Sequence, residues 1–254
     1  MKNRGARVAL LGIFIVMLPF FAFSSRKNKI FVNTKSFGNQ TGSSERPFKT
    51  IAQAMKEADK DSQIHIANGT YKENIEMKKG VEIFGENKKH VIIESSNKED
   101  SVILMRHKDR INKVTLMGGK YGVKVKGDAK VFITDVIIKN NNKDGIIAEE
   151  GDVRNERKVS ISKSEIMNNG RTGIFSHKRR LSIMDNNIHD NKSDGIDIEQ
   201  NSNAWIEGND VKDNGASGIK VRIDGYSIEV KKNNIRDNNR EGVEVEFDGK
   251  AGRV

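Results

Sequence analysis

Residues 181–199 read LSIMDNNIHDNKSDGIDIE, and residues 204–222 read AWIEGNDVKDNGASGIKVR. Placed one above the other without a gap, the two segments share a glycine, an asparagine four residues before it and an aliphatic residue directly after it. The pattern recurs along the chain at Gly145, Gly173, Gly195, Gly218 and Gly242, with intervals of 28, 22, 23 and 24 residues. An internal repeat of this length indicates a solenoid, in which each repeat forms one coil and buries its apolar side against the next.

The apolar positions of the repeat indicate β-strands. The glycine precedes two aliphatic residues separated by one other residue, a period of two that is typical of a strand with one buried face. A second aliphatic column lies seven residues before the glycine and consists of Ile138, Ile166, Ile188, Val211 and Ile235. Each coil is therefore predicted to hold two or three short strands that pair in parallel with the next coil, about 4.8 Å away. The predicted fold is all-β, a parallel β-helix solenoid.

The asparagine column has a structural explanation. Asparagine and glycine tolerate the left-handed backbone that tight turns require. Asparagines stacked at one buried position can also hydrogen-bond to each other in a ladder, which satisfies their amide groups. We therefore predict a ladder formed by Asn141, Asn169, Asn191, Asn214 and Asn238.

A leucine-rich repeat has a similar period but places leucine at most core positions. This chain has six leucines, three of them within residues 1–25. The core columns are instead isoleucine and valine, which favour strands. The leucine-rich repeat is therefore rejected.

The N-terminus has the layout of a secretory signal. Positive residues precede an apolar run from Val8 to Phe23, and small residues follow at a position suited to cleavage. Positive charges at Arg26 and Lys27 oppose translocation, so retention as a signal anchor is the alternative. Residues 1–25 are thus expected to be a signal peptide or signal anchor. The body is expected to be secreted, periplasmic or at the cell surface, or else anchored to the membrane.

Residues 26–95 are predicted to form the N-terminal cap and first coils, and residues 96–254 the regular repeats. Pro47 suits a first helical position, so an amphipathic helix is predicted from Phe48 to Ala58. Open strand edges at the end of a solenoid need a cover, and this helix is expected to provide it.

Composition restricts the partners. The chain has a formal net charge of +10, and its basic residues are spread along its length without interleaved aromatics, so no nucleic acid is expected. An acidic polysaccharide or cell-surface glycan fits better, and a solvated basic surface without a partner is the alternative. The absence of cysteine excludes disulfides and thiolate metal sites. The histidines show no metal-ligand spacing, so no metal site and no cofactor are expected.

The segment from Phe31 to Gly85 resembles the opening of right-handed β-helix proteins of the pectate-lyase-like superfamily. The matching segments are Phe31-Val32-Asn33, Pro47-Phe48-Lys49-Thr50-Ile51, Ile64-His65-Ile66-Ala67-Asn68-Gly69-Thr70-Tyr71, Glu73-Asn74-Ile75 and Ile83-Phe84-Gly85. The repeats from about residue 112 onward look like the same superfamily's coils. The resemblance implies a right-handed parallel β-helix solenoid with an N-terminal capping helix. It implies no single activity, because the superfamily includes lyases, hydrolases, epimerases and surface proteins.

Enzymes of this superfamily bind acidic polysaccharide along one strand face, with catalytic groups projecting outward after the glycine. At those positions the candidate catalytic residues are Asp197, Glu199 and Lys220, since carboxylates serve as acid or base and a lysine can abstract a proton. The candidate substrate-binding residues are His177, Asp194, Arg222 and Glu149. At these outward positions, acidic and basic residues alternate from one coil to the next. The alternation also suits an ion-pair ladder whose only role is to support the strand register. A Ca²⁺ site is the alternative, with oxygen ligands from Asp194, Asp197 and Glu199.

The nearest catalytic signature is the Asp-Pro-His-Asp of mannuronan C5-epimerases. The corresponding residues here are Asp197-Ile198-Glu199-Gln200, of which only the first agrees. The aspartate cluster of polygalacturonase-like hydrolases is missing as well. We therefore expect an exported protein that binds acidic polysaccharide or the cell surface without clear catalytic residues. The alternative is a lyase, epimerase or hydrolase acting on uronate-containing glycans. The chain is expected to be a monomer or to associate end to end.

Overall fold

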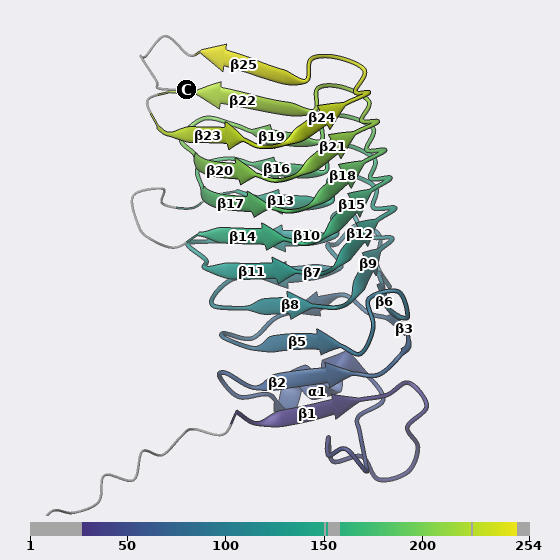
Figure 1. The fold of residues 1–254 in the computed structure, drawn as a ribbon. Helices are drawn as coiled ribbons and strands as arrows, with labels where there is room; N and C mark the ends of the chain where they lie inside the picture. The colour runs from purple at the N-terminus through teal and green to yellow at the C-terminus, as the bar shows by residue number, and fades with distance from the viewer. Residues whose placement is uncertain (1–26, 150, 152–157, 225, 248–254) are drawn as a thin grey trace, which may run out of the picture.

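The computed structural model describes residues 27–149, 151, 158–224 and 226–247. Over these residues the chain is a right-handed parallel β-solenoid whose coils stack along one axis (Figure 1). The all-β prediction is therefore confirmed. The predicted signal segment 1–25 and most of the loop 150–157 lie outside the described residues.

Three parallel sheets form the sides of the solenoid, and from β2 onward each coil contributes one strand to each sheet, whereas β1 adds a ninth strand to sheet A. Sheet A contains β1 (Lys29–Val32), β2 (Gln63–Ile66), β5 (Glu82–Gly85), β8 (Arg110–Asn112), β11 (Val131–Thr134), β14 (Val159–Ser162), β17 (Arg180–Met184), β20 (Asn203–Glu207) and β23 (Ile228–Lys231).

Sheet B contains β3 (Gly69–Lys72), β6 (Val91–Glu94), β9 (Thr115–Met117), β12 (Ile137–Lys139), β15 (Glu165–Met167), β18 (Asn187–His189), β21 (Asp210–Lys212) and β24 (Asn234–Arg236). Sheet C contains β4 (Ile75–Glu76), β7 (Ile103–Met105), β10 (Val123–Val125), β13 (Ile146–Ala148), β16 (Ile174–Ser176), β19 (Ile196–Ile198), β22 (Ile219–Ile223) and β25 (Val243–Phe247). Sheet A lies in front of sheet C in Figure 1.

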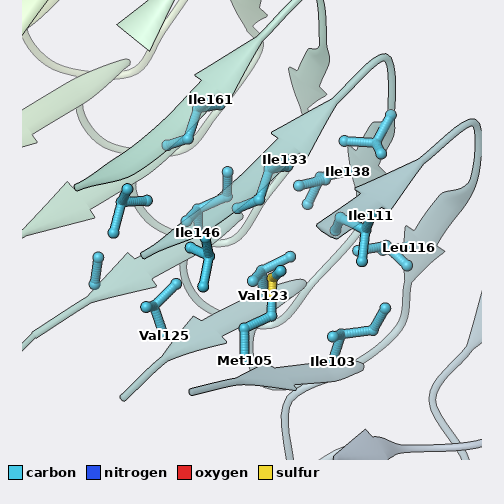
Figure 2. Packing of buried hydrophobic residues seen from close by; sticks show 14 of the residues in the cluster. Ile103, Met105, Ile111, Leu116, Val123, Val125, Ile133, Ile138, Ile146 and Ile161 are labelled. Carbon is cyan, nitrogen blue, oxygen red and sulfur yellow. The ribbon is translucent and has the colours of Figure 1, made fainter. Parts of the chain in front are cut away.

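The aliphatic columns of the repeat fill the inside of the solenoid. In sheet A, for example, Ile133 pairs with Ile161, and both side chains are fully buried. Figure 2 shows Ile133, Ile138 and Ile146, one from each sheet, converging on the same interior. Side chains between these positions point outward. The strand register therefore determines which surface residues of adjacent coils become neighbours.

In the coil of β17, β18 and β19, two tight turns share one design, a residue with positive φ followed by a buried polar side chain. Between β17 and β18 these residues are Asp185, at φ 56°, and Asn186. Between β18 and β19 they are Asp190, also at φ 56°, and Asn191. Short polar side chains tolerate this backbone better than branched ones do, and the positions equivalent to Asp185 on other coils hold Gly208 or the unbranched Lys163 and Lys232.

The predicted asparagine column is hydrogen-bonded in series. The side-chain amide nitrogens of Asn141, Asn169, Asn191 and Asn214 each donate to the side-chain oxygen of the next member, at 2.9 to 3.0 Å, and the series ends at Asn238. A second ladder runs through the other turn, where Asn186 donates to Asn209 and Asn209 donates to Asn233, each at 2.9 Å. This second column, nine residues before the glycine, was missed in the sequence.

The capping helix is shorter than predicted. Helix α1 spans Ile51–Glu57 and begins at Thr50, whose side chain forms a capping box with Gln53. Phe48 is instead extended, because its backbone pairs with β1 through hydrogen bonds of 2.8 Å to Phe31 and Asn33. The helix lies at the N-terminal end of the solenoid beside β1 and β2 (Figure 1). No helix within the described ranges is long and apolar enough to cross a membrane.

Candidate functional site

The outer face of sheet C carries the residues that the sequence nominated. The register of β10, β13, β16, β19, β22 and β25 stacks one outward column directly, in the order Lys124, Ile147, Phe175, Asp197, Lys220 and Glu244. A second column two residues further on contains Glu149, His177, Glu199, Arg222 and Glu246. All seven candidate catalytic and substrate-binding residues therefore belong to this face or its rim.

Both cations of the upper coils are held in ion pairs. Arg222 lies between Glu199 and Glu246, with a distance of 2.8 Å from its Nε to the Glu246 carboxylate. Lys220 Nζ lies 3.0 Å from Glu244 and 2.6 Å from Glu246. These hydrogen bonds raise the pKa of Lys220, so the amine stays protonated. Lys220 is therefore protonated and cannot act as a base. Its charge is already balanced by Glu244 and Glu246 and is not free to neutralise a uronate.

Asp197 is the exception within this network. Its side chain is buried, at 8 % exposure, and no hydrogen bond or ion pair joins its carboxyl to another residue that the structure describes. Burial, followed by the negative charges of Glu199 and Asp194, raises the pKa of Asp197 to about 7, while Lys220 and Arg222 act in the opposite direction. A carboxyl with such a pKa can release or accept a proton near neutral pH.

Asp194, on the rim of the face, accepts two hydrogen bonds. Its Oδ1 accepts the backbone N–H of Ser217 at 2.9 Å, and its Oδ2 accepts the hydroxyl of Ser193 at 3.1 Å. The hydroxyl of Ser217 in turn lies 2.6 Å from Glu244 Oε2. Asp194 thus fixes the turn between two coils and adds negative charge beside Asp197.

The lower coils of the face are different in character. Phe175 stacks directly below Asp197, and the guanidinium of Arg171 lies 5.5 Å from the centre of its ring. Ile147 and then Lys124 follow on the next two rungs. Lys124 makes no ion pair with any residue in the described ranges and lies 5.6 Å from the ring of Tyr121. The face therefore changes from basic to aromatic to acidic along the solenoid axis.

The register separates the nominated residues into two groups. It brings together Asp194, Asp197, Glu199, Lys220 and Arg222 on β19, β22 and their preceding turns. Glu149 and His177 lie in the Glu199 column but on the two preceding coils. The sequence columns already contained Phe175, Glu244 and Glu246, but the pattern assigned them no role, since neither their exposure nor their partners can be read from spacing.

No group of three or more histidine and acidic side chains among the described residues is arranged to hold a metal ion. Asp194 accepts a hydrogen bond from a backbone amide, and Glu199 is paired with Arg222. The carboxyl of Asp197 is buried. The geometry therefore gives the alternative of a Ca²⁺ site no support.

A right-handed parallel β-helix with two asparagine ladders and a polar outer face on one sheet defines a class of protein. The chain belongs to the right-handed β-helix family, whose model matches residues 121–253. The resemblance to pectate-lyase-like proteins is confirmed by solved structures with the same fold. No curated protein is similar enough in sequence to count as a match.

Three solved structures illustrate the likeness. Pectate lyase Pel9A has a TM-score of 0.58 and 12% identity, with 90% of this chain and 79% of that chain covered. The A-module of an Azotobacter vinelandii mannuronan C-5 epimerase has a TM-score of 0.53 and 16% identity, with 85% and 75% covered. A pectin methylesterase from Erwinia chrysanthemi has a TM-score of 0.53 and 12% identity, with 78% and 80% covered. Identities this low establish a shared fold only.

Proposed function

We propose that this protein is exported and binds an acidic polysaccharide on the outer face of sheet C. The observation that carries the proposal is the stacking of Lys124, Ile147, Phe175 and Asp197 on consecutive rungs. A cation for a sugar carboxylate, an aromatic ring for the apolar side of a sugar and a neutral carboxyl for a hydroxyl then follow one another in a line.

The distribution of charge on sheet C determines where the polysaccharide would lie. Around Asp197 the carboxylates outnumber the two cations, and both cations are already paired. A polyanion is repelled there, and the repulsion is weaker when Asp197 is protonated. Lys124, two rungs from Phe175, favours the opposite half of the face, whereas Arg171 lies 3.5 Å from the carboxylate of Asp144. In our proposal the polysaccharide therefore lies over the coils of β10, β13 and β16, and its end reaches Asp197.

The structural neighbours support the class of ligand. By their titles, the three neighbours are a pectate lyase, a mannuronan epimerase and a pectin methylesterase. Their polymers consist of uronic acids or their esters, so this solenoid shape is suited to long acidic sugar chains. Whether this protein also catalyses a reaction of such polysaccharides depends on the residues of its own surface.

Calorimetric titration of the full chain with polygalacturonate and polymannuronate tests the proposal. Phe175→Ala is expected to weaken binding about tenfold, because it removes the one aromatic ring of the outward column. Phe37→Ala, which removes an exposed ring from the segment between β1 and α1, is the control because it leaves sheet C unchanged. Binding that survives Phe175→Ala unchanged would contradict the proposed position.

A second function is favoured by Asp197 itself. A buried carboxyl with a pKa of about 7 is suited to act as a general acid or base on a sugar chain that reaches it. On this alternative the protein is a lyase, epimerase or hydrolase rather than a binding protein. Incubation with alginate and pectate would then give unsaturated products, altered uronate epimers or new reducing ends. Loss of those products in Asp197→Asn, with binding retained, is the expected signature of catalysis.

A further inference from the structure

Sheet A carries a row of cations on its outer face that the sheet C site does not use. Lys130, Lys158 and Arg180 directly precede the paired residues Val131, Val159 and Leu181 on consecutive coils. The backbone N–H of Val131 donates to the carbonyl of Lys158 at 3.2 Å, which fixes the neighbouring coils at this end of the strands. We name Lys130, Lys158 and Arg180 the basic row.

The basic row is electrostatically unfavourable in isolation. Its members lie one rung apart, about 4.8 Å for paired backbones, and like charges in register destabilise a sheet. Lys130 and Lys158 are exposed and Arg180 is half-buried, and none of the three makes an ion pair with a residue in the described ranges. On sheet C, by contrast, each cation of the upper coils is paired with carboxylates. Among the described residues, no carboxylate compensates the positive charge of the row.

An aromatic column lies beside the basic row, two residues further along each strand. The register places Phe132, Ser160, Ser182 and Trp205 on four consecutive rungs. Arg110, which pairs with Phe132 on the neighbouring rung, has its guanidinium carbon 3.7 Å from the ring centre of Phe132. Lys231, on the neighbouring strand β23, lies 3.6 Å from the ring centre of Trp205. The two serines between the rings leave a track floored by small hydroxyl side chains.

The track opens into a hollow at its Trp205 end. The hollow has a volume of about 500 Å³, and its lining includes Lys158, Arg180, Ser182 and Trp205. Trp205 is 38 % exposed, and its indole N–H donates to Glu207 at 2.8 Å, which fixes the orientation of the ring. A polar-rimmed hollow with one aromatic wall has the size and composition of a small-ligand site.

The carboxylates near this hollow do not cancel the basic row. Glu207 lies 2.9 Å from Lys232, and Glu229 lies 3.2 Å from Lys231. Glu207 is thus paired with a cation of the turn after β23, and Glu229 with a cation of its own strand. Among the described residues, the charge left unpaired on this part of sheet A is therefore positive.

We propose that the outer face of sheet A is a second binding surface for a carboxylate-bearing polysaccharide that runs along the solenoid axis. The basic row takes carboxylates of successive sugars, the serines meet hydroxyls, and the indole of Trp205 stacks against a sugar ring. This surface lies on another side of the solenoid from Asp197 and does not depend on whether sheet C binds sugar (Figure 1).

A polyuronate fits this track better than a nucleic acid does. It carries one carboxylate on each sugar, and consecutive sugars are spaced similarly to consecutive rungs. Each strand of duplex DNA advances about 3.4 Å along the helix axis per phosphate and winds around that axis, which does not match a straight row of cations about 4.8 Å apart. Single-stranded nucleic acid would need aromatic rings at neighbouring bases, whereas two serines separate Phe132 from Trp205.

The test compares two triple variants of the full chain that change the net charge equally. The first replaces the basic row, Lys130→Ala, Lys158→Ala and Arg180→Ala. The control replaces three lysines of sheet B strands, Lys72→Ala, Lys139→Ala and Lys212→Ala. Polygalacturonate binding is measured by calorimetry at several salt concentrations. The basic-row triple is expected to weaken binding about tenfold or more and to flatten its salt dependence, while the control triple leaves both nearly unchanged.

Trp205→Ala is expected to weaken binding about tenfold, and Trp205→Phe to restore part of it. Equal effects of the two triples, or none from the basic-row triple, would overturn the proposal, as would an absence of saturable binding. Tighter binding of a single-stranded oligonucleotide, abolished by the basic-row triple, would overturn it in favour of nucleic acid. Loss of binding in Phe175→Ala alone would leave the sheet C proposal standing and refute this one.

Discussion

Asp197 holds its carboxyl in a buried position of sheet C beside Glu199 and Asp194. Burial raises its pKa from the ordinary 3.8 to about 7, so between these values the folded state binds a proton that the unfolded state has lost. The stability of the fold must then fall as the pH rises from about 4, with the full penalty present above 7. An uncharged isostere removes this penalty.

Asp197→Asn is therefore expected to raise the free energy of unfolding at pH 8 by roughly 2 to 4 kcal/mol and to change it little at pH 4. Urea unfolding at both pH values measures the effect. Asp213→Asn, at an exposed turn position, is the control for the substitution itself. An equal effect of Asp197→Asn at both pH values would show that its charge is not suppressed.

Asn191 is an interior member of its ladder and serves several backbone groups at once. Its oxygen accepts the amide of Asn169, and its nitrogen donates to Asn214 and to the carbonyl of Ile166. Asn191→Ala leaves these buried partners unpaired, so it is expected to cost about 3 kcal/mol or more. Asn238→Ala, at the half-exposed end of the ladder, is expected to cost about 1 kcal/mol. Similar losses of stability in the two variants, measured by denaturant unfolding, would contradict the larger role assigned to the interior member.

At the scale of the strand, the repeat glycine is required by close packing between coils. A Cβ added at Gly195 would lie 2.5 Å from Val211 Cγ1 and 2.6 Å from the carbonyl oxygen of Gly218. At Gly242 the nearest atom to an added Cβ is 3.7 Å away, because no further coil in the described range lies against it. The same substitution thus meets opposite surroundings at two equivalent positions.

Gly195→Ala is therefore expected to destabilise the fold by about 3 kcal/mol, since backbone must move, whereas Gly242→Ala should lie within about 1 kcal/mol of the unaltered protein. Thermal unfolding of the two variants measures the contrast. A tolerated alanine at Gly195 would mean that neighbouring coils are less closely packed than the structure shows.

The success of the sequence pattern at this scale has a physical cause. Columns such as Ile138 and Ile166 recur because each coil must repeat the shape of the last, so periodicity alone predicts the strands and the inward face. The start of α1 was wrong, because Pro47 and Phe48 obey local helix preferences while β1 offers Phe48 backbone partners that the sequence does not display. The second ladder was missed because its column contains Val136 and Ser164 before its first asparagine, Asn186.

At the scale of the whole molecule, the solenoid separates its charges by side. Sheet C holds Lys220 and Arg222 in a network of carboxylates, and sheet A leaves Lys130 and Lys158 unpaired among the described residues. The spread of basic residues along the sequence concealed this, because cations about 22 to 28 residues apart become neighbours only after coiling. Spacing predicted which residues share a column, whereas the partners that decide each residue's role come from adjacent coils and the loops between them.

The stacked architecture also predicts a gradient of local stability along the axis. Ile166, Ile188 and Val211 are fully buried, but Ile235, in the same column of the last described coil, is only partly covered. In a solenoid each coil is stabilised chiefly by its neighbours, so an end coil opens at lower free energy than an interior one. We expect amide hydrogen exchange to be slowest in β15 and β18 and markedly faster in β24, as measured by mass spectrometry of peptides covering each strand. Equal protection in all three strands would instead show that the solenoid opens only as a single cooperative unit.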